Sequence, residues 1–599
     1  MKYFINFLTI LLILIGSLSY SQKPMVTKSH YSTQGFPIRA YLNLNNITTI
    51  FKNTGISDID IFESNSGFVY PYNTGKTAVF ISGLIWGVKI AGDPKVRVGG
   101  STYREGLQCG WIDASGNVIP PSHPQARIFR VRPEVYPGGP PVDLSREAMD
   151  EFKTEQEIRA QYELDWTEWP GDLGAPFKDI DENGIYNPII DIPGIEGAAQ
   201  TIWFVANDQE PGLTMNLYGT LPIGLEYQAT MWEYKDSLGF NNFFFRRYKL
   251  INKSDVLGNP TTFEDMYISM WSDPDIGDAL NDFVGCDTLL NLGYGYNGVA
   301  TDPIYDPLPP PAVGFDLIRG PIVEGNPGED KNRNGIEDIY DYGLKENNER
   351  VYGFINLPMT AFYYFVRNDP VLTDPPLGNP DGANQFYNFM QGKIGITGDP
   401  FIDPLTNQPT KFPLNGNPVT GEGWIDGILH SPDDRRLGLS TGPFQMAPGD
   451  TQIVVIAEIA GGAVTGVSHL NAITLVKSYS QIAQEFYDAE FPLPVSLNDN
   501  KVLPLNFELQ QNYPNPFNPS TKIRYSVLHT SKVVIKVFDV LGNEIESLLN
   551  EEKPAGTYEL TWYAEGLPSG VYFYQLRVSD PSADLEQGFV ETKKMLLLK

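Results

Sequence analysis

Several stretches of the chain have the apolar, β-branched and aromatic side chains that are typical of β-strands. Residues 77–90 form a long apolar stretch, and residues 243–251 and 266–271 are rich in aromatic side chains. Residues 451–460 are rich in Val and Ile, which favour buried strands. The pattern predicts a mainly β, multi-domain chain with a β-sandwich-like body.

One or two helices interrupt this pattern. Ser145 is a candidate N-cap for the first, in which we expect four apolar residues to share one face: Met149, Phe152, Ile158 and Tyr162. The second is predicted near residues 468–488, where apolar residues return at near-helical spacing and Ser468 is a candidate cap.

The N-terminus has the layout of a signal peptide. Lys2 precedes an apolar run over residues 7–15, and the small residues Ser19 and Ser21 predict cleavage after Ser21. The apolar run is too short to span a bilayer comfortably. We therefore expect residues 1–21 to be removed on export and the mature protein not to span the membrane.

Turn-rich and polar stretches divide the rest of the chain. Proline- and glycine-rich sequence over residues 120–141 follows a β-rich N-terminal region, residues 22–125, and leads into a central β-rich body, residues 126–490. Residues 491–504 carry two prolines and then a polar run, as expected of a linker.

A small β-domain is predicted after the linker, over residues 505–599. β-branched and aromatic side chains alternate along residues 533–538 and again along residues 571–576. Glycines between these segments mark turns. About seven short strands in a segment of this length are typical of an immunoglobulin-like β-sandwich.

Motifs within this segment resemble the type A C-terminal sorting domain of the type IX secretion system. Asn-Tyr-Pro-Asn-Pro-Phe-Asn-Pro-Ser-Thr stands at residues 512–521, and Thr-Lys-Lys-Met-Leu-Leu-Leu-Lys stands at residues 592–599. Asp-Val-Leu-Gly at residues 539–542 also fits. The resemblance implies passage through the periplasm and recognition of residues 505–599 by the outer-membrane translocon. It also implies secretion or attachment at the outer cell surface.

The composition is strongly acidic. The chain has 73 acidic and 43 basic residues and a formal net charge of −30. A surface of this sign argues against binding nucleic acid and is compatible with binding divalent cations. The 57 glycines and 48 prolines suit a turn-rich β architecture.

The best candidate calcium site is the loop at residues 330–341. Oxygen-bearing side chains stand at loop positions 1, 3, 5, 9 and 12, glycine stands at position 6, and a backbone carbonyl would serve at position 7. The loop resembles those of dockerin or thrombospondin type 3 repeats more than an EF-hand, and a solvated turn is the alternative. The predicted ligands are Asp330, Asn332, Asn334, Ile336, Asp338 and Asp341.

A second loop, which begins at Asp179, keeps part of the same spacing. Position 12 is Ile190 and Asp191 comes one residue late, so the loop is stretched, Glu182 contributes, or the site is weak. A solvated turn is equally compatible with this sequence. The candidate ligands are Asp179, Asp181, Asn183 and Asn187.

A third acidic cluster follows a predicted core strand, with a spacing that matches no standard loop. Such crowding is unfavourable unless a cation or solvent relieves it, and a solvated acidic loop is the favoured interpretation. The weak candidate ligands are Asp273, Asp275, Asp278 and Asp282.

The sequence contains no recognised catalytic motif. It lacks the Gly-x-Ser-x-Gly elbow, the His-Glu-x-x-His helix and a phosphate-binding glycine loop. We therefore favour a calcium-stabilised, non-enzymatic surface or extracellular component. The alternatives are a secreted hydrolase acting on polysaccharide or protein, and an adhesin that binds cell-surface polysaccharide. The adhesin requires exposed aromatic side chains, for which Trp166, Trp169 and Trp232 are candidates.

The two cysteines allow one disulfide. Cys109 and Cys286 could pair in an oxidising compartment. Two separate buried thiols are slightly favoured, because a core of this size needs no covalent link.

Overall fold

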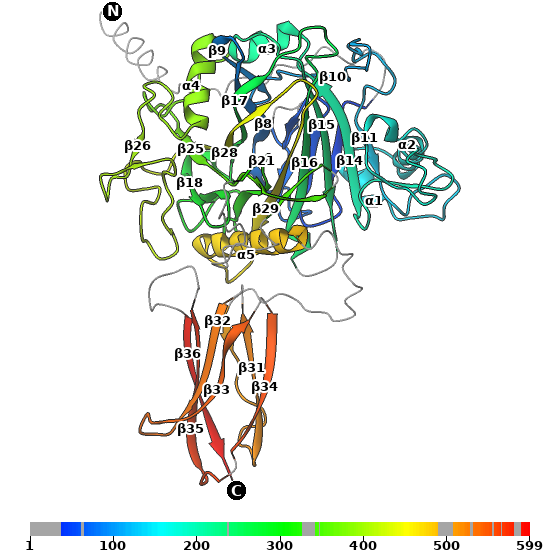
Figure 1. Cartoon of the computed structure of the whole chain (residues 1–599). Coiled ribbons are helices and arrows are strands. Elements are labelled where there is room, and N and C mark those ends of the chain that lie inside the picture. The colour runs from blue at the N-terminus through cyan, green and yellow to red at the C-terminus, as the bar shows by residue number, and fades with distance from the viewer. Residues whose placement is uncertain are drawn as a thin grey trace, which may run out of the picture.

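The computed structural model describes residues 37–60, 65–235, 239–325, 342–346, 348–488, 507–527, 531–553, 556–564, 566–579 and 589–598. The predicted signal peptide, the linker at residues 491–504 and the candidate calcium loop at residues 330–341 lie outside these ranges. Strands far outnumber helices in the described residues, which confirms the mainly β, multi-domain class (Figure 1).

Two large antiparallel sheets form the body. The first has eight strands, with β8, β17 and β28 side by side at its centre. Its strands are β1 (Arg39–Leu42), β2 (Thr49–Lys52), β3 (Ile56–Ser57), β8 (Ile81–Ile90), β9 (Asp93–Gly100), β17 (Phe263–Asp273), β25 (Ala361–Val366) and β28 (Arg435–Met446).

The second sheet has nine strands, with β15, β16 and β29 near its centre. Its strands are β10 (Gln108–Cys109), β11 (Phe129–Val131), β14 (Gln200–Asn207), β15 (Leu225–Glu233), β16 (Phe243–Asn252), β18 (Asp282–Asp287), β19 (Leu292–Asn297), β20 (Ala312–Arg319) and β29 (Thr451–Gly461).

Strands from both sides of residue 125 share the first sheet. β8 comes from the N-terminal β-rich region and pairs with β17, which comes from the central body. Residues 22–125 and residues 126–490 therefore contribute to one continuous sheet.

Alternate side chains of β29 explain its unbroken apolar sequence. Val454 and Ile456 join the core that contains buried residues of both sheets. Val455, Ala457 and Ile459 join a second core that lies against helix α5. A strand covered on both faces has no solvent side, so it needs no polar alternation.

Five helices are present in the described residues, where the sequence predicted one or two. They are α1 (Ser145–Asp150), α2 (Glu155–Thr167), α3 (Pro211–Tyr218), α4 (Pro380–Met390) and α5 (His469–Asp488). The prediction near residues 468–488 is confirmed as α5, and the Ser468 hydroxyl accepts the backbone N–H of Asn471 at 3.1 Å.

The helix predicted after Ser145 is instead two helices, α1 and α2. Phe152 lies between them with a φ of 54° and is 93% exposed, so it does not share the predicted face. Thr154 begins α2 with a capping box to Glu157, which supplies a start signal that the apolar spacing hid.

Short ribbons and three 3₁₀ turns complete the body. The ribbon strands are β4 (Ile59–Asp60), β5 (Asn65–Ser66), β6 (Phe68–Val69), β7 (Thr77–Val79), β12 (Phe177–Lys178), β13 (Ile192–Pro193), β21 (Ile322–Glu324), β22 (Tyr342–Leu344), β23 (Arg350–Tyr352), β24 (Phe354–Asn356), β26 (Phe401–Ile402) and β27 (Pro409–Thr410). The turns are η1 (Gly171–Leu173), η2 (Phe240–Asn242) and η3 (Ala279–Asn281).

The C-terminal residues form two sheets around a core of their own (Figure 1). The strands predicted over residues 533–538 and 571–576 are confirmed as parts of β32 and β35. The strands are β30 (Glu508–Leu509), β31 (Ser520–Val527), β32 (Ser531–Phe538), β33 (Glu544–Lys553), β34 (Gly556–Tyr563), β35 (Gly570–Ser579) and β36 (Phe589–Leu597).

Cys109 and Cys286 are separate buried thiols and do not form a disulfide. None of the helices in the described part of the chain combines the length and apolarity that a membrane crossing needs.

Candidate metal centre

The loop over residues 179–191 is closed by a short ribbon. β12 and β13 pair in antiparallel register, with Lys178 opposite Ile192. This pairing brings the two ends of the loop together, so residues far apart along it can approach one another.

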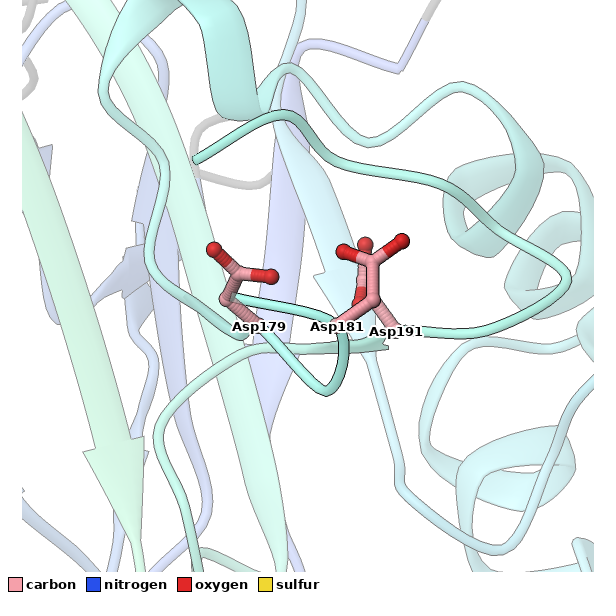
Figure 2. Close-up of side chains that lie close together, drawn as sticks. All are labelled: Asp179, Asp181 and Asp191. Atoms are coloured by element: carbon pink, nitrogen blue, oxygen red, sulfur yellow. The ribbon is translucent and has the colours of Figure 1, made fainter. Parts of the chain in front are cut away.

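Three carboxylates converge inside this loop. Oxygen atoms of Asp179, Asp181 and Asp191 all lie within 4.8 Å of one another. Figure 2 shows their carboxylates on the same side of the loop. Asp191 is 1% exposed, whereas Asp181 is exposed. The structure therefore brings two predicted ligands together with Asp191, the residue that came one position late.

Backbone N–H groups fix two of these carboxylates. Asp179 accepts the N–H groups of Asn183 at 3.2 Å and Gly184 at 2.6 Å. Asp191 accepts those of Ile180 at 2.9 Å and Asn187 at 2.7 Å. The Gly184 N–H is the largest cause that holds the pKa of Asp179 below its usual value.

The side chains of the two predicted asparagine ligands contact the loop backbone. Asn183 Oδ1 accepts the N–H of Ile185 at 2.7 Å, and Asn187 Oδ1 accepts the N–H of Ile189 at 3.1 Å. These are local turns that asparagine commonly forms. Both amides thus shape the loop around the three carboxylates.

Two tryptophans attach this region to the body. Trp166 Nε1 donates to the carbonyl of Pro188 at 3.0 Å, and Tyr186 donates its hydroxyl to the Trp166 carbonyl at 2.6 Å. Trp169 Nε1 donates to the carbonyl of Pro176, just before the loop, at 2.8 Å. The loop is thereby fixed to the end of α2.

The aromatic platform that the adhesin hypothesis requires is not formed by the three predicted tryptophans. Trp166, Trp169 and Trp232 are 6%, 3% and 1% exposed. Trp232 stacks on Phe245 in the core beneath α5. These rings pack inside the protein, so the three tryptophans give the adhesin alternative no support.

A second acidic cluster contains Asp273, Asp275 and Asp434, whose oxygen atoms also lie within 4.8 Å of one another. Here a guanidinium is present. Arg436 Nε lies 3.6 Å from Asp273 Oδ1, and its Nη1 lies 3.2 Å from Asp434 Oδ1. Tyr103 donates its hydroxyl to Asp273 at 2.7 Å.

Strand register explains why Asp434 joins this cluster. Ser272 of β17 pairs with Leu437 of β28 in antiparallel register. The same register continued beyond the strand ends places residue 275 opposite residue 434. The sequence alone does not reveal this contact, because it depends on how two strands that are far apart along the chain pair.

The other two predicted ligands of this region lie outside the cluster. Asp278 caps η3 and accepts the N–H of Leu280 at 3.1 Å. Asp282 accepts the N–H of Ile276 at 3.3 Å. Each carboxylate instead fixes a turn of the chain.

Comparison with known families identifies the C-terminal segment. Residues 511–583 match the family described as the secretion system C-terminal sorting domain. The protein is a type IX secretion cargo. It is secreted or attached to the outer cell surface, as the motifs in residues 505–599 predicted, and its sorting domain implies interaction with the secretion system.

Other comparisons leave the body unidentified. Comparison with curated proteins gave no match. Solved structures with some likeness include a polysaccharide lyase, with 7% identity over 63% of this chain and 34% of that chain at a TM-score of 0.18. Dimeric latent PorU from Porphyromonas gingivalis has 9% identity over 66% and 31%, at a TM-score of 0.14.

PorZ, described as an essential surface component of the type IX secretion system of Porphyromonas gingivalis, has 12% identity over 67% of this chain and 43% of that chain, at a TM-score of 0.14. The chain thus spans less than half the length of each of these proteins. At such TM-scores the likeness carries no argument about fold or function.

Proposed function

We propose that this secreted or surface-attached protein is a calcium-stabilised structural or binding component rather than an enzyme. The observation that carries the proposal is the convergence of Asp179, Asp181 and Asp191. Among the described residues, none of these three carboxylates forms an ion pair with a Lys, Arg or His side chain. Close carboxylates repel one another, and a divalent cation would relieve that repulsion.

The donor set suits a hard cation. A carboxylate has about four lone-pair positions, and Asp179 and Asp191 each accept two backbone N–H groups, so each keeps about two for an ion. Calcium takes about six to eight oxygen ligands, so backbone carbonyls and water would supply the remainder.

The proposed role of the ion is to hold the loop. Asp179 and Asp191 come from opposite ends of a segment that Trp166 fixes to α2. A cation bound by both carboxylates would link those ends, and it could do so only in the folded chain, where the two carboxylates lie close together. Calcium would therefore stabilise the native state by mass action.

Calcium binding and thermal unfolding test this proposal. We expect calcium to raise the melting temperature of chelator-treated protein, with a stabilisation on the order of 3 kcal/mol at about a hundredfold excess over Kd. Asp181→Asn should weaken binding at the loop, because Asp181 is an exposed member of the trio. Asp330→Asn should remove a separate binding event if the loop at residues 330–341 also binds calcium.

Glu182→Gln is the matched control for Asp181→Asn. It removes one negative charge from the adjacent position but lies outside the trio of converging carboxylates. Equal loss of calcium affinity in both variants would mean either that only the overall charge of the loop matters or that Glu182 also binds the ion. If wild-type protein retains no calcium and melts identically with and without chelator, the proposal is wrong.

A further inference from the structure

Arg319 differs from every other buried arginine in the described residues. Seven arginines are buried, and six of them form an ion pair with a carboxylate: Arg127, Arg130, Arg132, Arg246, Arg435 and Arg436. Arg319 is 3% exposed, and no carboxylate of the described residues pairs with it. In a chain with 73 acidic residues, this exception requires an explanation.

Neutral groups accept all of the hydrogen bonds that Arg319 donates. Its Nη1 donates to Asn348 Oδ1 at 2.9 Å and to the Tyr487 hydroxyl at 3.4 Å. Its Nη2 donates to the carbonyls of Leu344 and Lys345. Its Nε–H has no acceptor among the described residues. A buried guanidinium is costly when nothing offsets its charge, so an anion is the missing partner.

Arg319 also lines a cavity of about 520 Å³ between α5, the end of β20 and β24. Pockets for small ligands have volumes of roughly 300–1,000 Å³. Aliphatic side chains form a large part of its wall: Leu289, Leu290, Leu317, Ile318, Leu344 and Leu357. An occupant therefore needs an aliphatic body as well as a negative charge.

The carboxylates nearest the cavity do not supply that charge. Asp316 is buried and accepts the hydroxyl of Ser480, a cavity residue, at 2.7 Å. Burial raises the pKa of Asp316 well above its usual value and so favours its neutral form. Asp488 lines the cavity and accepts a hydrogen bond from Gln484, and no ion pair joins it to Arg319.

A second guanidinium strengthens the positive charge here. Burial lowers the pKa of Arg247, and the positive charge of Arg319 lowers it further. Arg247 donates to the backbone carbonyl of Glu346 at 3.1 Å. The charges of the two guanidinium groups therefore repel each other, and a bound anion would relieve that repulsion.

We propose that this cavity binds a small aliphatic carboxylate, with its charged end on Arg319 and its chain along the leucine and isoleucine wall. Such a ligand brings the negative charge that the site lacks and an aliphatic chain that fits its apolar wall. The carboxylate supplies the counter-charge for the guanidinium, and the aliphatic chain covers the apolar lining.

Decanoate and decanol are suitable probes, because they share an aliphatic chain and differ in the charged group. Isothermal titration calorimetry of the full chain should detect decanoate binding, with decanol at least about tenfold weaker. Leu289→Trp should weaken decanoate binding about tenfold or more by filling the cavity while leaving Arg319 intact. Leu429→Trp is the matched control, because both leucines are 54% exposed and Leu429 lies outside the cavity.

Arg319→Gln should remove the preference for decanoate over decanol. If this variant does not unfold cooperatively, the Leu289→Trp and Leu429→Trp pair still decides the question. Equal binding of decanoate and decanol to the wild type would overturn the proposal. So would the absence of decanoate binding at about 1 mM, or equal binding by the two tryptophan variants.

Discussion

The two acidic clusters of the body have the same density of carboxylates and different surroundings. Asp273, Asp275 and Asp434 lie around Arg436, a cation supplied by the chain itself. Asp179 and Asp191 are held by backbone N–H groups, and no basic side chain of the described residues pairs with them. Crowded aspartates alone therefore do not indicate a metal site. A basic side chain beside them already offsets their charge, and only a cluster without one needs a metal ion.

The cluster around Arg436 is an internal ionic network. Burial alone would lower the pKa of Arg436, but Tyr103 and the nearby carboxylates Asp374, Asp273 and Asp434 raise it overall. The guanidinium therefore stays charged in the interior. A metal ion would have to compete with a cation that is already in place.

Arg436→Met should have the largest effect, because it leaves buried carboxylates without their counter-charge. Loss of one partner from a buried ionic pair costs about 3–5 kcal/mol. Urea unfolding of the full chain would measure the change in the free energy of unfolding.

Arg367→Met is the matched control for Arg436→Met. Arg367 pairs with Asp433 at 2.8 Å, and both side chains are partly exposed, so its loss should cost about 1 kcal/mol or less. Equal destabilisation by the two variants would show that Asp273 and its neighbours do not depend on Arg436.

Trp166→Phe tests the attachment of the other cluster. The substitution removes the 3.0 Å hydrogen bond to Pro188 inside the loop, so we expect a loss of about 1 kcal/mol and weaker calcium binding. Trp169→Phe removes a similar bond to Pro176, outside the loop, and should cost stability without weakening calcium binding. A calcium affinity that falls equally in both variants would contradict the special role of Trp166.

The sequence predicted elements better than it predicted neighbours. The strand at residues 451–460, helix α5 and the sorting domain follow from local periodicity and motifs, and all three are confirmed. Asp434 could not be predicted as a neighbour of Asp273, because their contact depends on the register between β17 and β28.

Asp191 illustrates a different limit. Asp191 lies one residue beyond the standard loop, so a weak site was one of the interpretations of the sequence, yet the β12–β13 ribbon brings it beside Asp179. Loop spacing assumes that the chain wraps a ligand in one fixed way. Here hydrogen bonds to Ile180 and Asn187 set the position of Asp191 instead.

Titration of Asp179 should give the smallest effect and the sharpest distinction between the clusters. Its folded pKa is lowered, first by the Gly184 N–H. Its stabilising contribution is therefore fully present above the unfolded pKa of about 3.9 and is lost as pH falls through the folded value. NMR titration of the carboxyl carbon should give a midpoint below that of an unfolded-state aspartate.

Calcium should lower the apparent pKa of Asp179 further, because the cation and the proton compete for the same oxygens. Asp113 is the internal control in the same NMR titration. Hydrogen bonds, first from the Asn117 side chain, also lower its pKa, but it belongs to neither acidic cluster. If calcium shifts Asp113 and Asp179 equally, the ion acts only through ionic strength. A shift confined to Asp179 would show that Asp179 binds the cation, whereas Asp113 only accepts N–H groups.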